Sequence, residues 1–223
     1  LMVSEATRAP IEAALGADAT QVATFDQNVS LRLDPAGALF RTATGEPSLH
    51  ATGHGDVVDG LRRSGLLPRF VAGGGRFVFV TNLDNLGATL DPGLLGWFAA
   101  QQEPLLVELC EKEPGDRGGI PVDVAGRTQV LEEFRLPRGF DPAAVGVFNT
   151  NTMWLDARAL LGVEHPWSWF TVDKQVDDRP AVQFERLLGE LTAALPTRYV
   201  VVPRDGAASR FLPVKDRAEL EAR

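Results

Sequence analysis

Residues 53–91 read GHGDVVDGLRRSGLLPRFVAGGGRFVFVTNLDNLGATLD. The stretch opens on a small-residue turn and continues as a helical pattern with a break near Ser64 and Gly65, and three glycines precede an apolar run at 77–80. That run is uninterrupted and rich in β-forming residues, as is typical of a strand buried on both faces of an α/β sheet. Because ligands of such sheets bind beyond the carboxyl ends of the strands, we expect a functional site around Asn82 and Asp84.

The composition is that of an ordinary globular protein. Of the 223 residues, 44% are hydrophobic and 23% are charged, which is enough to bury a sizeable core. The formal net charge of −8 leaves no basic stripe for a nucleic-acid backbone, so we expect no polynucleotide partner. No apolar run approaches the length of a membrane span, and the single Cys110, which we expect to be buried, cannot form an internal disulfide. We therefore expect a cytoplasmic protein without membrane contact, of unknown oligomeric state.

Helical and strand-like segments alternate along the rest of the chain. We predict a helix at 7–15 with Pro10 in its first turn, a strand at 22–25 and an extended segment at 29–33. Further along, we predict a helix from Asp91 to Phe98 and strands at 105–110 and from 120 onward.

Three segments carry candidate functional residues. At the turn, Gly53 and Gly55 allow positive φ and close approach of the backbone to a ligand, and Asp56 can cap the helix that follows. Asp84 ends the apolar strand, where a carboxylate can hold Mg²⁺ together with substrate phosphates; a simple turn-forming aspartate is the alternative. Segment 148–154, FNTNTMW, offers amides at the end of a strand between aromatic side chains, a combination that binds sugar hydroxyls and covers sugar C–H faces.

In this order, the motifs resemble the eukaryote-type UTP–glucose-1-phosphate uridylyltransferases, also called UDP-glucose pyrophosphorylases. That family has a GHGD turn, a helix ending near Ser-Gly, and a strand followed by Asp-Asn-Leu-Gly-Ala. Further matches are a Phe-x-Gln step ending at Gln27, a Gly-Gly pair at Gly118, a leucine-glutamate strand at 129–133, the Phe-Asn-Thr-Asn step at 148–151, and the run SRFLPVK at 209–215. The resemblance implies a nucleotide-diphospho-sugar transferase fold, a Rossmann-like and GT-A-like mixed α/β sheet flanked by helices. Residues 1–223 would form the central and C-terminal part of one catalytic domain.

The resemblance also implies an activity and a set of site residues. The reaction converts UTP and glucose 1-phosphate into UDP-glucose and pyrophosphate, with Mg²⁺ as the cofactor. The implied contacts are Gln27 with uracil, Gly53 and His54 with phosphates, Asp84 with Mg²⁺, Lys215 with the transferring phosphates, Glu132, Asn149 and Asn151 with the sugar, and Asn82 and Gly118 with the substrates. Lys215 and Asp84 would carry the catalysis, and Glu133 is an alternative to its neighbour Glu132. Without the neighbouring motifs, Gln27, His54 and Lys215 would be ordinary loop or surface residues.

Two other interpretations stay open. In the first, the chain is a non-catalytic sugar-nucleotide-binding fragment or a pseudoenzyme. In the second, it belongs to a pyrophosphorylase of different or broader specificity, which acts on UDP-sugars or on UDP-N-acetylhexosamines. His54 speaks against the N-acetylhexosamine enzymes, whose corresponding turn carries asparagine.

The sequence departs from the family pattern at four positions where the family has a polar or charged residue. Arg117 replaces a lysine of the family, and Thr152 replaces an asparagine. Ile120 and Arg186 each replace a threonine. Thr152 leaves open which sugar hydroxyl is recognised. Arg186 falls in segment 183–186, which matches a helix of the family and is expected to be helical here.

Two parts of the family pattern have no match. No segment before Gln27 matches the family's glycine-rich nucleotide loop, and no segment after Lys215 matches its C-terminal β-helix domain. We therefore expect that sequence is missing upstream, and that these 223 residues alone make no measurable UDP-glucose.

Overall fold

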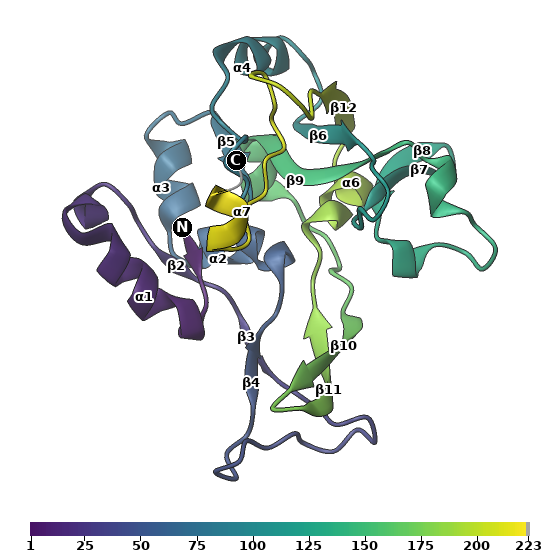
Figure 1. Cartoon of the computed structure of the whole chain (residues 1–223). Helices are drawn as coiled ribbons and strands as arrows, with labels where there is room; N and C mark the ends of the chain where they lie inside the picture. The colour runs from purple at the N-terminus through teal and green to yellow at the C-terminus, as the bar shows by residue number, and fades with distance from the viewer. Residues whose placement is uncertain (222–223) are drawn as a thin grey trace. The chain divides into compact units, whose positions relative to one another are not determined.

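The computed structural model describes residues 1–221, coloured from the N-terminus to the C-terminus in Figure 1. The chain divides into two compact units. The first comprises Leu1–Gly74 and Pro166–Leu188, and the second comprises Gly75–His165 and the chain from Gly189 onward. Within residues 1–221, no helix is both long and apolar enough to cross a membrane. The assignment of the chain to a single catalytic domain stays a prediction.

A four-stranded sheet forms the centre of the second unit, with the order β12-β6-β9-β5 (Figure 1). The strands are β5 (Phe77–Val80), β6 (Leu105–Glu111), β9 (Val147–Asp156) and β12 (Thr197–Val202). β6 pairs parallel with β12 and antiparallel with β9, which in turn pairs antiparallel with β5. The mixed α/β sheet that the sequence predicts is therefore confirmed.

Helix α4 (Pro92–Ala99) packs on this sheet and forms where the sequence predicts it. Its N-terminus is capped by Asp91, whose carboxylate accepts a hydrogen bond from the Leu94 amide at 2.8 Å. Phe98 of the helix packs with Leu106 of β6 and Trp154 of β9, and all three side chains are buried. Because each such burial contributes roughly 1.5–3 kcal/mol, this cluster holds the helix and the sheet together.

The apolar run at 77–80 forms β5 as predicted, but the prediction that both its faces are buried is wrong. All four residues of β5 are partly exposed, and β5 is the last strand on its side of the sheet within the described chain. The buried strand is β6, where every residue from Leu105 to Cys110 is buried, including the cysteine as expected. Apolar content alone cannot distinguish a central strand from an outer one, because the strand order depends on pairing between distant segments.

The remaining elements of the second unit are short. β7 (Ile120–Val124) and β8 (Arg127–Leu131) form an antiparallel hairpin. The strand predicted at 129–133 ends early, so Glu132 follows β8 and does not lie within it. The short helices are η3 (Glu133–Arg135), η4 (Pro142–Ala144), α5 (Ala157–Gly162), α6 (Leu191–Ala194) and α7 (Arg217–Glu221), and η5 (Leu188–Glu190) spans the point where the chain passes between units.

The first unit begins with β1 (Met2–Val3), which pairs parallel with β2 (Phe25–Asp26). Between them lie α1 (Glu5–Leu15) and η1 (Gly16–Thr20). The prediction that Pro10 lies in the first turn is wrong, because α1 begins at Glu5 and Pro10 falls inside the helix. Since proline has no N–H, α1 lacks one internal hydrogen bond at that point.

The helical pattern over 57–71 forms two helices, as its break indicates. η2 (His54–Asp56) leads into α2 (Val57–Arg63), and α3 (Leu66–Ala72) follows. Between the helices, Gly65 has a φ of 73°, a left-handed conformation that stops the first helix and starts the second.

Two antiparallel ribbons complete the first unit. β3 (Val29–Leu31) pairs with β4 (Leu49–Ala51), and β10 (Phe170–Val176) pairs with β11 (Arg179–Glu185). The helix expected at 183–186 from the family resemblance is therefore wrong, since this segment ends a strand. Ala181 and Gln183 are buried in alternation along β11, which is the period of two that a strand requires.

Candidate functional site

The GHGD turn of the first unit is crossed by residues 186–188, which we call the strap. The Gly55 amide donates to the Arg186 carbonyl at 3.0 Å, and the Arg186 amide donates to the Thr52 carbonyl at 2.8 Å. A Cβ on Gly53 would lie 2.6 Å from the Arg186 carbonyl oxygen, and one on Gly55 would lie 2.7 Å from the Arg186 carbonyl carbon. Both glycines are therefore required by the close approach of the chain's own backbone.

Asp56 anchors the turn from inside the unit. Its side chain is fully buried and accepts hydrogen bonds from the Asn28 amide at 3.1 Å and the Asn28 side chain at 2.9 Å. The Thr52 hydroxyl also donates to it, and an Arg186 Nη1 lies 3.3 Å from its Oδ1. The prediction that Asp56 caps the following helix is wrong: Asp56 is itself in a helical conformation, and its side chain makes no cap hydrogen bond.

The structure brings Gln27 and Gly53 together. The Gln27 side-chain amide donates to the Gly53 carbonyl at 2.6 Å, and its backbone amide donates to the Val3 carbonyl at 2.9 Å. One side-chain N–H of Gln27 is thereby used to orient the amide group beside the turn.

His54 follows directly in the same turn. Its Nδ1 accepts a hydrogen bond from the Leu188 amide of the strap at 3.0 Å. Burial lowers the pKa of His54 from its ordinary value, against the opposing effect of the Glu185 and Asp56 carboxylates. The imidazole is therefore neutral at pH 7.

In the second unit, the loop after β5 pairs with the segment that carries Lys215. The Val214 amide donates to the Asp84 carbonyl at 2.8 Å, and Asn85 and Pro213 form an antiparallel bridge. The buried Asn85 side chain accepts from the Leu212 amide at 2.8 Å. Asp84 and Lys215 are thus held in adjacent segments at the end of β5, both exposed.

A buried ion pair fixes this segment to the sheet. Both carboxylate oxygens of Glu108 on β6 accept hydrogen bonds from Arg210, at 2.7 and 2.8 Å. Trp154 Nε1 donates to the same carboxylate at 2.7 Å, and Glu108 is completely buried. Sequence reasoning missed this pair, although a single glutamate inside the apolar run 105–110 is a signal that a buried cation must be near.

Asn149 and Asn151 lie inside β9, so the expectation that these amides end a strand is wrong. The register between β6 and β9 shifts between Glu108 and Leu109, leaving Thr150 and Asn151 without partners in the ladder. At this bulge, Asn151 has a φ of 56°. The Asn149 side chain donates to Asn151 Oδ1 at 2.8 Å and accepts from the Asn151 amide at 3.1 Å. The bulge therefore turns the Asn151 amide out of the strand, and the buried Asn149 supports it.

The Gly118-Gly119 segment lies beside the same strand. The Asn149 amide donates to the Gly119 carbonyl at 2.7 Å, and a Cβ on Gly119 would lie 3.0 Å from Glu132 Oε1. Burial raises the pKa of Glu132, with a further rise from Glu133. Gly118, Glu132, Asn149 and Asn151 therefore form one group within the second unit.

The structure thus gathers the predicted site residues into three groups. Gln27, Gly53 and His54 meet in the first unit, while the second unit holds the Asp84–Lys215 pairing and the group around Asn149. Asn82 is exposed just before Asp84. Among residues 1–221, no cluster of three or more His, Cys, Asp or Glu side chains is arranged to hold a metal ion. Asp84 offers one carboxylate, which fits the way Mg²⁺ binds when phosphates supply the other oxygens.

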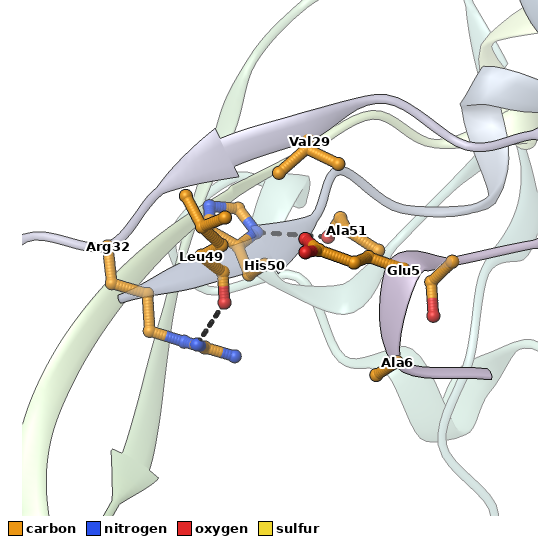
Figure 2. Close-up of a pocket in the computed structure, with 8 residues that line it drawn as sticks. Glu5, Ala6, Val29, Arg32, Leu49, His50 and Ala51 are labelled. Atoms are coloured by element: carbon orange, nitrogen blue, oxygen red, sulfur yellow. Dashed lines mark hydrogen bonds between the residues drawn. The ribbon is translucent and has the colours of Figure 1, made fainter. Parts of the chain in front are cut away.

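A separate hollow of about 210 Å³ lies in the first unit between the start of α1 and the β3–β4 ribbon. Figure 2 shows the Glu5 carboxylate and the Arg32 guanidinium on different walls, with Val29 and Leu49 beside them. In the described chain, no predicted site residue lines this hollow, so it stands apart from the three groups.

The fold is that of the nucleotidyltransferases. The chain superposes on a mutant of UDP-glucose pyrophosphorylase from Leishmania major with a TM-score of 0.80 at 27% identity, covering 100% of this chain and 54% of the other. A second mutant from L. major, solved in complex with UDP-glucose, gives a TM-score of 0.79 at 27% identity, covering 99% of this chain and 53% of the other.

The sequence comparison gives the family. The pattern of the UTP–glucose-1-phosphate uridylyltransferases matches residues 1–221, and the chain belongs to this family. A UTP–glucose-1-phosphate uridylyltransferase from Encephalitozoon cuniculi is 31% identical over 188 residues, which are 79% of this chain and 37% of that protein. The chain therefore spans less than half the length of the curated relatives it matches. The resemblance and the fold class predicted from the sequence are confirmed.

Proposed function

We propose that the chain is part of a uridylyltransferase that forms UDP-glucose and pyrophosphate from UTP and glucose 1-phosphate. The observation that carries the proposal is the pairing of the Asp84 and Lys215 segments, in which the Val214 amide donates to the Asp84 carbonyl at 2.8 Å. A carboxylate and an ammonium held together beyond the end of a strand can share one polyphosphate, the first through a metal ion and the second directly. The L. major relative bound to UDP-glucose supports the choice of ligand.

In this proposal, a phosphate oxygen of glucose 1-phosphate attacks the α-phosphorus of UTP. The bond between the α-phosphorus and the bridging oxygen breaks, and pyrophosphate leaves with the electron pair. Lys215 stabilises the negative charge on the transferring phosphates as a point charge. Asp84 would hold Mg²⁺, which when bound neutralises phosphate oxygens.

The other site residues bind and orient the two halves of the product. Gln27 pairs with uracil, and Gly53 and His54 face phosphate. The buried support of Asn149 favours Asn151 as a donor and acceptor for sugar hydroxyls, with Glu132, Gly118 and Asn82 as further substrate contacts. A cytoplasmic location is part of the proposal, and the single, buried Cys110 supports a reducing compartment.

The metal role of Asp84 is tested by Asp84→Asn. We expect calorimetry to show a large loss of UTP affinity in the presence of Mg²⁺ and a small loss in EDTA, because only the metal-bound form uses the carboxylate. Uridine, which has no phosphates, is the control ligand and should bind as before. Equal losses of UTP affinity with and without Mg²⁺ would remove Asp84 from the metal site.

The sugar role of Asn151 is tested by Asn151→Gly, which removes the amide but tolerates the φ of 56°. We expect UDP-glucose binding to weaken by about 1–3 kcal/mol, the cost of one good hydrogen bond with its partner left unpaired. UDP, which lacks the sugar, should bind with nearly unchanged affinity. If UDP and UDP-glucose weakened alike, the sugar assignment would be wrong, and binding of both without any turnover would favour a non-catalytic fragment.

A further inference from the structure

The strap determines which nitrogen of His54 carries the proton. The Leu188 amide points at Nδ1 from 3.0 Å. A backbone N–H can only donate, so Nδ1 must present its lone pair. The single proton of the neutral ring therefore lies on Nε2.

The strap cannot easily withdraw from the ring. Its first residue, Arg186, is bonded through both backbone groups, the amide to Thr52 at 2.8 Å and the carbonyl to Gly55 at 3.0 Å. The residues that they join to Arg186, Thr52 and Gly55, lie on either side of His54 in the sequence. Gly53 and Gly55 have no Cβ that would clash with the strap. The Leu188 amide is thus held against the ring by the same contacts that form the turn.

Charged groups around the turn are already paired. Arg186 Nη1 lies 2.6 Å from Asp59 Oδ2 and 3.3 Å from Asp56 Oδ1. Lys174 Nζ lies 3.6 Å from Glu185 Oε1. Asp56 and Asp59 share the Arg186 guanidinium, and Glu185 pairs with Lys174, so each carboxylate near His54 is paired with a cation. This pairing weakens the attraction of these carboxylates for a second proton on the imidazole. Burial acts in the same direction and lowers the pKa of His54.

We infer that His54 serves the nucleotide site as a neutral hydrogen-bond donor through Nε2 and supplies no positive charge to a bound phosphate. The inference rests on the proposed function, in which this histidine faces a phosphate oxygen. A cationic ring would carry a proton on Nδ1 against the Leu188 N–H, so the hydrogen bond would be lost and two buried donors would face each other. A phosphate bound at the turn would then gain a hydrogen bond from His54 Nε2 but no positive charge from the ring.

The test is a long-range ¹H–¹⁵N correlation spectrum of the histidine rings. The chain has three histidines, and His54→Gln assigns the signals of His54. We expect Nδ1 unprotonated and Nε2 protonated at pH 7, because burial lowers the pKa of His54 from its ordinary value. Addition of UDP-glucose should shift the Nε2 signal and leave Nδ1 unprotonated.

A pair of variants at one position isolates the amide. Leu188 is buried, so Leu188→Ala and Leu188→Pro both lose its packing, but only the proline also loses the N–H. Leu188 begins η5, a position where proline is tolerated. We expect the pKa of His54 to rise toward its ordinary value in Leu188→Pro and to stay low in Leu188→Ala. The same rise in both variants would overturn the inference.

The spectra also separate this inference from the function on which it rests. A proton on Nδ1 at pH 7, either free or with UDP-glucose bound, overturns the inference and leaves nucleotide binding intact. If calorimetry detects no binding of UDP-glucose at all, the proposed function fails, and the phosphate role of His54 fails with it.

Discussion

Replacing Glu108 by alanine is expected to lower the free energy of unfolding by about 3–5 kcal/mol, because it leaves the buried guanidinium of Arg210 without its counter-ion. Arg210 donates to both oxygens of this carboxylate, at 2.7 and 2.8 Å, and its side chain is only 8% exposed. Trp154 Nε1 would also lose its acceptor. Urea unfolding monitored by tryptophan fluorescence measures the loss.

Two control variants define what this result means. Arg217→Ala breaks an ion pair whose side chains are 89% and 64% exposed, and it should leave the unfolding midpoint unchanged. The double variant Glu108→Leu with Arg210→Met replaces both charges by apolar groups and should recover much of the loss. If Glu108→Ala unfolds at the midpoint of the unsubstituted protein, the pair does not anchor the segment that carries Lys215.

Removing the Lys215 ammonium is expected to lower kcat for UDP-glucose synthesis by about 10²–10³, the cost of one donor aimed at charge that develops in the transition state. Lys215→Ala changes an exposed side chain, so the fold should be unaffected. The measurement is made on the longest gene product that carries residues 1–223, by steady-state release of pyrophosphate.

Arg217→Ala is the matched control, because it removes another exposed cation two residues further along the same segment. It should keep the full kcat. A higher KM for Lys215→Ala with an unchanged kcat would show that Lys215 binds substrate without stabilising the transition state.

The sequence predicts those elements that local patterns determine. The apolar run of β5, the helix break at Gly65 and helix α4 each depend on neighbouring residues, and each forms where expected. The family and the fold class also follow from motifs along one chain. The segments that pair or form hydrogen bonds with each motif could not be predicted from the sequence, because they are distant in the chain.

The wrong predictions share this cause. Asp56 has the right position for a helix cap, but Asn28, Thr52 and Arg186 reach its carboxylate from other segments. Residues 183–185 of the segment predicted as a helix are strand because β10 lies alongside them, and no pattern within four residues reveals that pairing. The bulge at Asn151 was missed for the same reason, since a register shift exists only between two strands.

The bulge at Asn151 also limits how sugar specificity can be changed by design or by evolution. A φ of 56° is readily adopted by glycine, asparagine and aspartate, and forcing another side chain into it costs on the order of 1–3 kcal/mol. Most other substitutions at position 151 should therefore lower the free energy of unfolding. New specificities are more accessible at Glu132, whose position after the end of β8 imposes no such conformation. Because the bulge that presents the Asn151 amide favours few residue types, it limits the substitutions at this position by which the protein could come to recognise another sugar.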